Sequence, residues 1–230
     1  MEKRFLDSIQ SLDKTLRESS LSDIAIDGSE ILIDSILDDG LLKDIPIVST
    51  LVNLIKISSS ISSALLLKKI IYFLDGIKDI PPEKRYKMIN AINSDKNYKI
   101  KVGEKLLYII DRCEDHDKTS LIAELFKAFL NNEIEYKDFL HGSSILNSIY
   151  SDDLKSFLAL NEKVLYAEDA MPFVSFGLCS ISFEMPVLEY DPPTDWKEGP
   201  EEYKLKGGEA FASITDIGVK FRKIFEKYSM

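Results

Sequence analysis

The stretch Ile45–Leu74, IPIVSTLVNLIKISSSISSALLLKKIIYFL, is the most apolar part of the chain, and its first two thirds carry a single charge, Lys56. Asp44 can cap a helix here, with Pro46 in the first turn, where its missing N–H costs nothing. Apolar residues recur through the stretch at helical spacing. The serines of 58–63 form a poor helix interior because Ser competes for backbone hydrogen bonds. We therefore expect either a break between two helices or a small-residue face that another helix approaches closely.

The same stretch raises the question of membrane contact. A spanning helix needs about 20 predominantly apolar residues. The window 45–67 has that length, but Lys56 lies at its middle, and a central Lys costs roughly 2.5–3.5 kcal/mol on insertion. Three alternatives stay open: a pair of core helices in an all-α domain, a latent membrane element that inserts after a trigger, or an oligomerisation surface. The residues expected to make membrane or oligomer contact are Ile47, Val48, Leu51, Leu54, Ile55, Lys56, Lys68 and Lys69.

Charge is unevenly distributed along the 230 residues, whose net charge is −10. Residues 1–40 hold 10 acids and 4 bases, whereas residues 41–110 hold 6 acids and 12 bases. The basic block therefore contains the apolar stretch. Basic residues beside an apolar amphipathic element attract an anionic membrane surface. The alternative is that this block pairs with the acidic N-terminal helices of its own chain.

Composition favours an ordinary soluble protein, with 45% hydrophobic and 30% charged residues. The length allows one large or two modest domains. The two cysteines, Cys113 and Cys179, are far apart and suggest no disulfide framework, so we expect a reducing cytoplasm. The N-terminus lacks the apolar region of a secretory signal. The expected location is cytoplasmic, with membrane association left open.

Helical periodicity extends over most of the first 160 residues. Asp79-Ile80-Pro81-Pro82 is a clear break, and Pro82 can start the next helix. Ser151 is the expected N-cap of the last helix in this part. The predicted helices, apart from those in the apolar stretch, cover residues 2–17, 21–39, 82–93, 103–113, 119–130, 136–150 and 152–160.

The sequence changes character after Leu160. Residues 172–183 have strand-like composition, residues 184–208 contain four prolines and predict a long loop, and residues 210–214 predict a returning strand. Thr215 is expected to cap a final helix. The predicted fold is mainly α: a multi-helix domain over 1–160 that contains the apolar hairpin 45–74, then a small α+β domain over 161–230. Helices followed by a hairpin and a helix form a winged-helix-like order.

Two motifs resemble an uncharacterised bacterial protein family. One is LLKDIPIVSTLVNLIK, Leu41–Lys56, and the other is VGEKLLYIIDRCEDHDKTSLIAELFKAFLNNEIEYKDFL, Val102–Leu140. Family members often carry Gly where this chain has Ser49 and Asn53. The resemblance covers about residues 20–160 and implies a bacterial origin, with a link to phage defence or abortive infection as a hypothesis that no residue pattern supports. The segment ITDIGVKFRKIF, Ile214–Phe225, resembles the final strand and helix of winged-helix domains.

Catalytic and metal-binding patterns are weak. Cys113 and His116, three residues apart, could face each other on a helix, but no motif supports a nucleophile. Asp111, Cys113, Asp115, His116 and Asp117 form a ligand-rich cluster without the paired spacing of zinc sites. No Gly-rich loop follows a strand. We therefore expect no enzyme activity, no cofactor and no metal site.

Partner preference follows from the acidic second part. Residues 151–230 hold 15 acids and 9 bases, whereas phosphate contacts to nucleic acid need bases. A protein partner or self-association fits this charge better, and the expected contact residues are Trp196, Tyr190 and Tyr203. The function favoured by the sequence is a non-enzymatic interaction protein, a cytoplasmic bacterial defence or toxin-like effector whose apolar hairpin acts on an anionic membrane. The alternative is a winged-helix nucleic-acid-binding regulator with a helical dimerisation domain.

Overall fold

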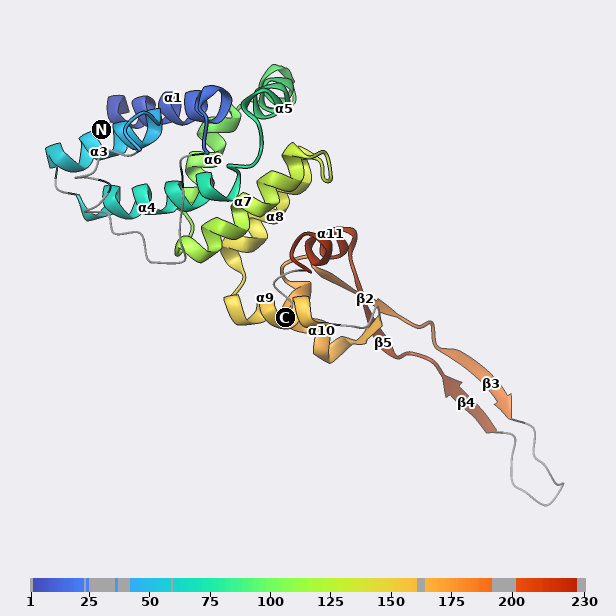
Figure 1. The fold of residues 1–230 in the computed structure, drawn as a ribbon. Helices are drawn as coiled ribbons and strands as arrows, with labels where there is room; N and C mark the ends of the chain where they lie inside the picture. The colour runs from blue at the N-terminus through green and yellow to red at the C-terminus, as the bar shows by residue number, and fades with distance from the viewer. Residues whose placement is uncertain are drawn as a thin grey trace. The chain divides into compact units, whose positions relative to one another are not determined.

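The chain divides into two compact units, Met1–Ser148 and Ile149–Met230 (Figure 1). The computed structural model describes residues 2–22, 24, 36, 42–58, 60–160, 164–191 and 202–226. Over these residues the protein is mainly helical, with its strands confined to the second unit. This arrangement confirms the predicted fold class, a multi-helix part followed by a small α+β part.

The first unit is built from helices whose starts largely follow the predicted signals. Pro82 begins a helix as expected, and Asp115 caps another by accepting a hydrogen bond from the Lys118 N–H at 2.8 Å. The predicted helix over 21–39 lies mostly outside the described residues. The helices are α1 (Glu2–Glu18), α3 (Pro46–Ser58), α4 (Ile61–Gly76), α5 (Pro82–Ser94), α6 (Val102–Asp111), α7 (His116–Leu130) and α8 (Tyr136–Ser148).

The apolar stretch folds as the helical hairpin α3–α4. The break falls within the serine run, where Ser60 caps α4 by accepting a hydrogen bond from the Ser63 N–H. Helix α3 packs against α1 and α4, and α4 packs against α7. Phe73 of α4 meets Phe126 of α7 with ring centroids 5.7 Å apart, inside an aromatic cluster that continues into α8. Burial of this hairpin therefore builds the core of the first unit.

A buried arginine joins α1 to the start of α5. Arg85 is completely buried, and its Nε donates to the Ile80 carbonyl at 3.1 Å. Its other two nitrogens donate to the carbonyls of Thr15, at 3.4 Å, and Ser19. These two carbonyls lie at the C-terminal end of α1, where backbone oxygens run out of helical partners; the Thr15 carbonyl also accepts from the Ser19 N–H at 3.2 Å. The guanidinium thus serves as a cap supplied from elsewhere in the sequence.

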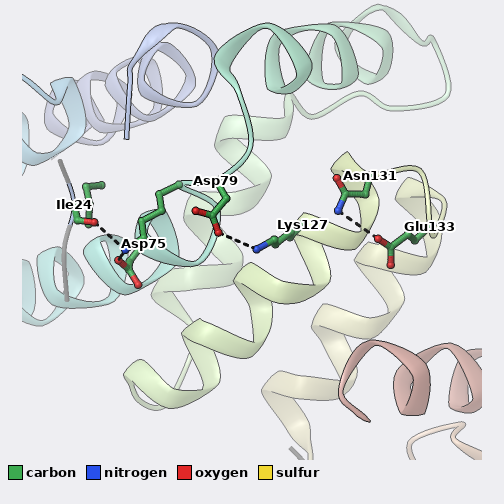
Figure 2. A network of polar contacts seen from close by, with 7 residues as sticks. Ile24, Asp75, Asp79, Lys127, Asn131 and Glu133 are labelled. Atoms are coloured by element: carbon green, nitrogen blue, oxygen red, sulfur yellow. Dashed lines mark hydrogen bonds and ion pairs between the residues drawn. The ribbon is translucent and has the colours of Figure 1, made fainter. Parts of the chain in front are cut away.

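A second set of polar contacts fixes the turn between α4 and α5 (Figure 2). Lys78 donates to the Ile24 carbonyl at 3.1 Å and to Asp75 at 2.8 Å. Beside it, Asp79 accepts a hydrogen bond from Lys127 of α7 at 3.3 Å (Figure 2). The turn is therefore held to both α4 and α7 by side chains of opposite charge.

The second unit combines helices with two antiparallel sheets (Figure 1). The larger sheet has the strand order β1-β5-β2, in which the last strand lies between the other two. Among the described residues only α10 lies between β1 and β2, and the winged-helix-like order stays a prediction. The elements are α9 (Ser151–Ala159), β1 (Val164–Tyr166), α10 (Ala167–Val174), β2 (Cys179–Phe183), β3 (Val187–Asp191), β4 (Glu202–Lys206), β5 (Ala210–Ile214) and α11 (Asp216–Ile224).

Four predictions that concern the second unit differ from the structure. The strand-like segment 172–183 begins as the end of α10, which has acids in its first turn and buries Phe173 against Phe157 of α9 at 5.4 Å. The predicted loop 184–208 contains the paired strands β3 and β4. Tyr150 rather than Ser151 takes the N-cap position of α9. Because Phe157 packs on α10, α9 belongs to the second unit, whereas the sequence placed it in the first.

Candidate interaction surface

The residues predicted to contact a membrane or another subunit divide into core and surface groups. Ile47, Val48 and Leu51 are at most 1% exposed and form part of the packing of α3. Leu54 and Ile55 are half-buried, and Lys56 is exposed. Three of these residues are therefore core residues in this structure, and they can meet a bilayer only if the hairpin leaves the bundle.

The two remaining basic residues of that prediction lie on α4. Lys69 donates to the carbonyls of Asp111, at 3.0 Å, and Cys113, so its ammonium group binds the end of α6. A cation at a helix C-terminus is favoured by the helix dipole. Lys68 is half-buried. Lys69 therefore has a structural contact within the first unit.

What the hairpin does expose lies around its turn. Ile57 is 71% exposed, Ile61 is 78% exposed and Leu65 is 53% exposed. We call these three side chains the hairpin tip. None of the three was predicted as a contact residue. No helix among the described residues combines the length and apolar character needed to cross a bilayer.

The Cys/His cluster at the start of α7 has structural contacts. Cys113 is buried, its Sγ donates to the Ile109 carbonyl at 3.4 Å, and burial raises its pKa. A thiol with a raised pKa is a poor nucleophile at neutral pH. The His116 ring lies 4.6 Å from that of Tyr72. Within the described ranges no three His, Cys, Asp or Glu side chains gather as a metal-binding group.

A polar cavity of about 340 Å³ lies among α1, α5 and α6. Asp13 and Arg17 line it and form an ion pair at 2.9 Å, and the Arg17 guanidinium lies 5.7 Å from the Tyr86 ring centroid. Lys101, also on the lining, donates to the Asn93 carbonyl at 2.8 Å. Asp13, Arg17 and Lys101 each make one contact within the protein, but Asp13 Oδ1 and Arg17 Nε are buried without a hydrogen-bond partner in the described part of the chain. We treat the cavity as the second of the two candidate sites.

The stronger candidate is the two-stranded ribbon β3–β4, which continues β2 and β5 away from the helices of the second unit (Figure 1). Gly207 and Gly208 join β4 to β5 with φ of +83° and +84°, a conformation that favours glycine. A Cβ on Gly207 would also lie 2.9 Å from the Met185 carbonyl oxygen. These glycines let the chain pass from the larger sheet into the ribbon.

Register divides the ribbon into two unlike faces. Leu188 is paired with Leu205, and Tyr190 is paired with Tyr203. Directly opposed residues of an antiparallel pair share a face, and residues two apart on one strand do so as well. The four side chains therefore share one face, which we call the apolar ribbon face. Their exposed fractions are 67%, 69%, 45% and 62%, respectively.

The opposite face of the ribbon is charged. Glu189 is paired in register with Lys204, and its carboxylate forms an ion pair with Lys206 on the neighbouring strand. Cross-strand pairs of opposite charge stabilise a sheet. The ribbon is thus amphipathic: one face carries the Glu189–Lys206 ion pair, and the apolar face is open to solvent.

This surface includes two of the partner contacts expected from the sequence, and their role in binding stays a prediction. Tyr190 and Tyr203 were expected partner contacts, and the structure brings their ring centroids to 5.6 Å. Trp196 lies outside the described residues. Leu188 and Leu205 were missed, although each stands two residues from a tyrosine. That period-two alternation is a strand signal and could have identified both residues.

Comparison with known proteins adds no relative to this description. No protein-family model matches the chain, and neither a curated protein nor a solved structure matches it. The proposed function therefore depends on the geometry of the surfaces described above.

Proposed function

We propose that this chain is a non-enzymatic interaction protein and that the apolar ribbon face is where a partner protein binds. One observation carries the proposal: four large, uncharged side chains share one face of a ribbon, and each is at least 45% exposed. Contiguous exposed apolar patches mark interaction sites. A two-stranded ribbon without further packing is also only marginally stable in water, so a bound partner would stabilise it.

Protein is a better partner for this face than nucleic acid. Affinity for nucleic acid comes largely from contacts between basic side chains and phosphates. The apolar ribbon face carries no charge, and Lys206 of the opposite face is paired with Glu189. Tyrosine is enriched at protein interfaces because its ring buries a large area while its hydroxyl still finds a hydrogen-bond partner. Tyr190 and Tyr203 supply two such rings.

Site-specific photo-crosslinking in cells tests the proposal. A photoreactive amino acid at Leu188 or Tyr203 should give discrete protein adducts, because these positions would lie inside the interface. The matched controls are Tyr150 and Val219, which are 76% and 57% exposed but lie away from the ribbon in sequence and structure. Equal adduct yields at ribbon and control positions would refute the proposal.

A second candidate function is contact with an anionic membrane surface through the hairpin tip. Its supporting observation is the exposure of Ile57, Ile61 and Leu65, with exposed Lys56 adjacent in sequence. Apolar side chains next to a cation suit the membrane interface. The membrane contact expected of the whole hairpin is thus proposed here only for the hairpin tip.

Vesicle binding tests this second candidate. Wild-type protein should co-sediment with vesicles that contain anionic lipid, and the Ile57→Asp, Ile61→Asp variant should not. Both residues are exposed, so the double variant should keep the fold. Absence of wild-type binding at low salt would remove the membrane function and leave the ribbon proposal intact.

A further inference from the structure

We infer that the partner on the apolar ribbon face is a second copy of this chain, so that two ribbons stack face to face in a symmetric dimer. This inference rests on the proposed function, because it names the occupant of the same surface. It requires that the face be complementary to itself, that it be large enough, and that no charge be buried when it closes.

The face meets the first requirement through its two rows. Leu188 with Leu205 forms an aliphatic row, and Tyr190 with Tyr203 forms an aromatic row, adjacent along the strands. A two-fold axis that runs across the ribbon between the rows places each leucine row on the partner's tyrosine row. Each contact is then made twice, which is the property of an isologous interface. Stacked sheets pack about 10 Å apart, a spacing that side chains of this size fill.

Area is also sufficient for a specific contact of modest strength. Given the exposed fractions of 45–69%, the four side chains offer on the order of 500 Å² from each copy. Two copies would bury about 1,000 Å², near the lower limit for a specific interface. We therefore expect a reversible dimer that forms in the micromolar range rather than an obligate one.

The salt dependence of binding distinguishes a second copy from a different protein of opposite charge. The ion pair between Glu189 and Lys206 lies on the outer face and remains solvated when the apolar faces meet. Each copy has a net charge of −10, so two copies repel each other at long range. Salt screens that repulsion. Dimerisation should thus strengthen as salt rises, whereas binding to an oppositely charged partner should weaken.

Sedimentation equilibrium of the full chain tests the inference. The wild-type mass should rise from 26.1 kDa towards twice that value with increasing concentration, and more readily at higher salt. The Leu188→Ser, Tyr203→Ser variant should stay monomeric. The control variant, Glu189→Gln with Lys206→Gln, alters the outer face of the same ribbon and should still dimerise.

A crosslinking measurement covers the case in which the serine variant loses the ribbon fold. Tyr203→Cys should give a covalent dimer with a short bismaleimide, whereas Lys204→Cys, on the outer face, should give far less. The native thiols do not compete, because Cys113 and Cys179 are each only 2% exposed. A chain that is monomeric at all concentrations and gives no covalent dimer would overturn the second copy as occupant.

The two proposals then fail separately. Photo-adducts of Tyr203 with a different protein, together with a monomeric chain, would refute the dimer and support the ribbon as a docking surface. Absence of both dimer and adducts would refute both proposals. Adducts at twice the chain mass would support both.

Discussion

Replacing Arg85 with methionine tests how the first unit holds its N-terminal helix. The guanidinium is fully buried and donates to three carbonyls, those of Ile80, Thr15 and Ser19. Methionine keeps most of the apolar volume but provides no donor. The buried Ile80 carbonyl and the half-buried Ser19 carbonyl would then each lose this hydrogen bond.

The expected magnitude follows from two opposing contributions. Hydrogen bonds from a charged donor contribute roughly 1.5–3 kcal/mol each, or about 4–9 kcal/mol for three. Burial lowers the pKa of Arg85 to about 10, which corresponds to a cost of about 3 kcal/mol for keeping the charge inside the protein. Methionine would remove that cost. The net loss in the free energy of unfolding should therefore be about 1–6 kcal/mol.

Urea denaturation followed by far-UV circular dichroism measures this loss, because the first unit is predominantly helical. Lys87→Met, at an exposed position of the same helix α5, is the matched control and should change stability by less than about 0.5 kcal/mol. Arg85→Lys should fall between the two, since one ammonium group cannot reach all three carbonyls. A methionine variant as stable as the wild type would show that the cost of burying the charge cancels the hydrogen bonds, and our reasoning would be wrong.

Three further predictions concern Gly218, a buried residue of α11, and the two thiols. Gly218→Ala should destabilise the second unit by about 2–4 kcal/mol in a urea titration, because the new Cβ would overlap the Leu178 carbonyl oxygen. Val219 is exposed on the same helix, so Val219→Ala should change the stability of the unit little. Cys113 and Cys179 are buried, so Ellman's reagent should label them in urea and not in the native state; rapid native labelling would contradict their burial. Burial raises the pKa of both thiols, so the thiols ionise more readily in the unfolded chain. The free energy of unfolding should therefore fall as pH rises above about 9. A Cys113→Ala, Cys179→Ala variant should show a shallower decline.

Local signals in the sequence predicted much of the helical unit. Pro82 begins α5, and the serine run separates α3 from α4, because these residues act on their own backbone within a few positions. Thr215 likewise caps α11 by accepting a hydrogen bond from the Gly218 N–H at 3.2 Å. Such signals are independent of tertiary packing, which is why a single sequence reveals them.

Features set by distant partners were harder to predict. The start of the segment 172–183, predicted as strand-like, lies in α10, where Phe173 packs on Phe157, a contact that the local composition does not encode. The ribbon was mistaken for a loop because prolines outweighed the alternation of Leu188 and Tyr190. In the candidate site, Tyr190 and Tyr203 were therefore predicted only as separate contact residues. That they share one face depends on the register of β3 and β4, two strands that are separated in the sequence.

The position of Arg85 in the chain has a consequence for synthesis. The Ser19 carbonyl receives its hydrogen bond from a residue 66 positions later. At about 5–20 residues per second, a ribosome needs roughly 3–13 s to supply that donor after the end of α1 has been made. Throughout this interval α1 lacks its cap, together with α5 and α6, against which it packs. The nascent helix α1 can thus pack on α3 before its cap arrives, and a chaperone can bind the face that α5 and α6 later cover.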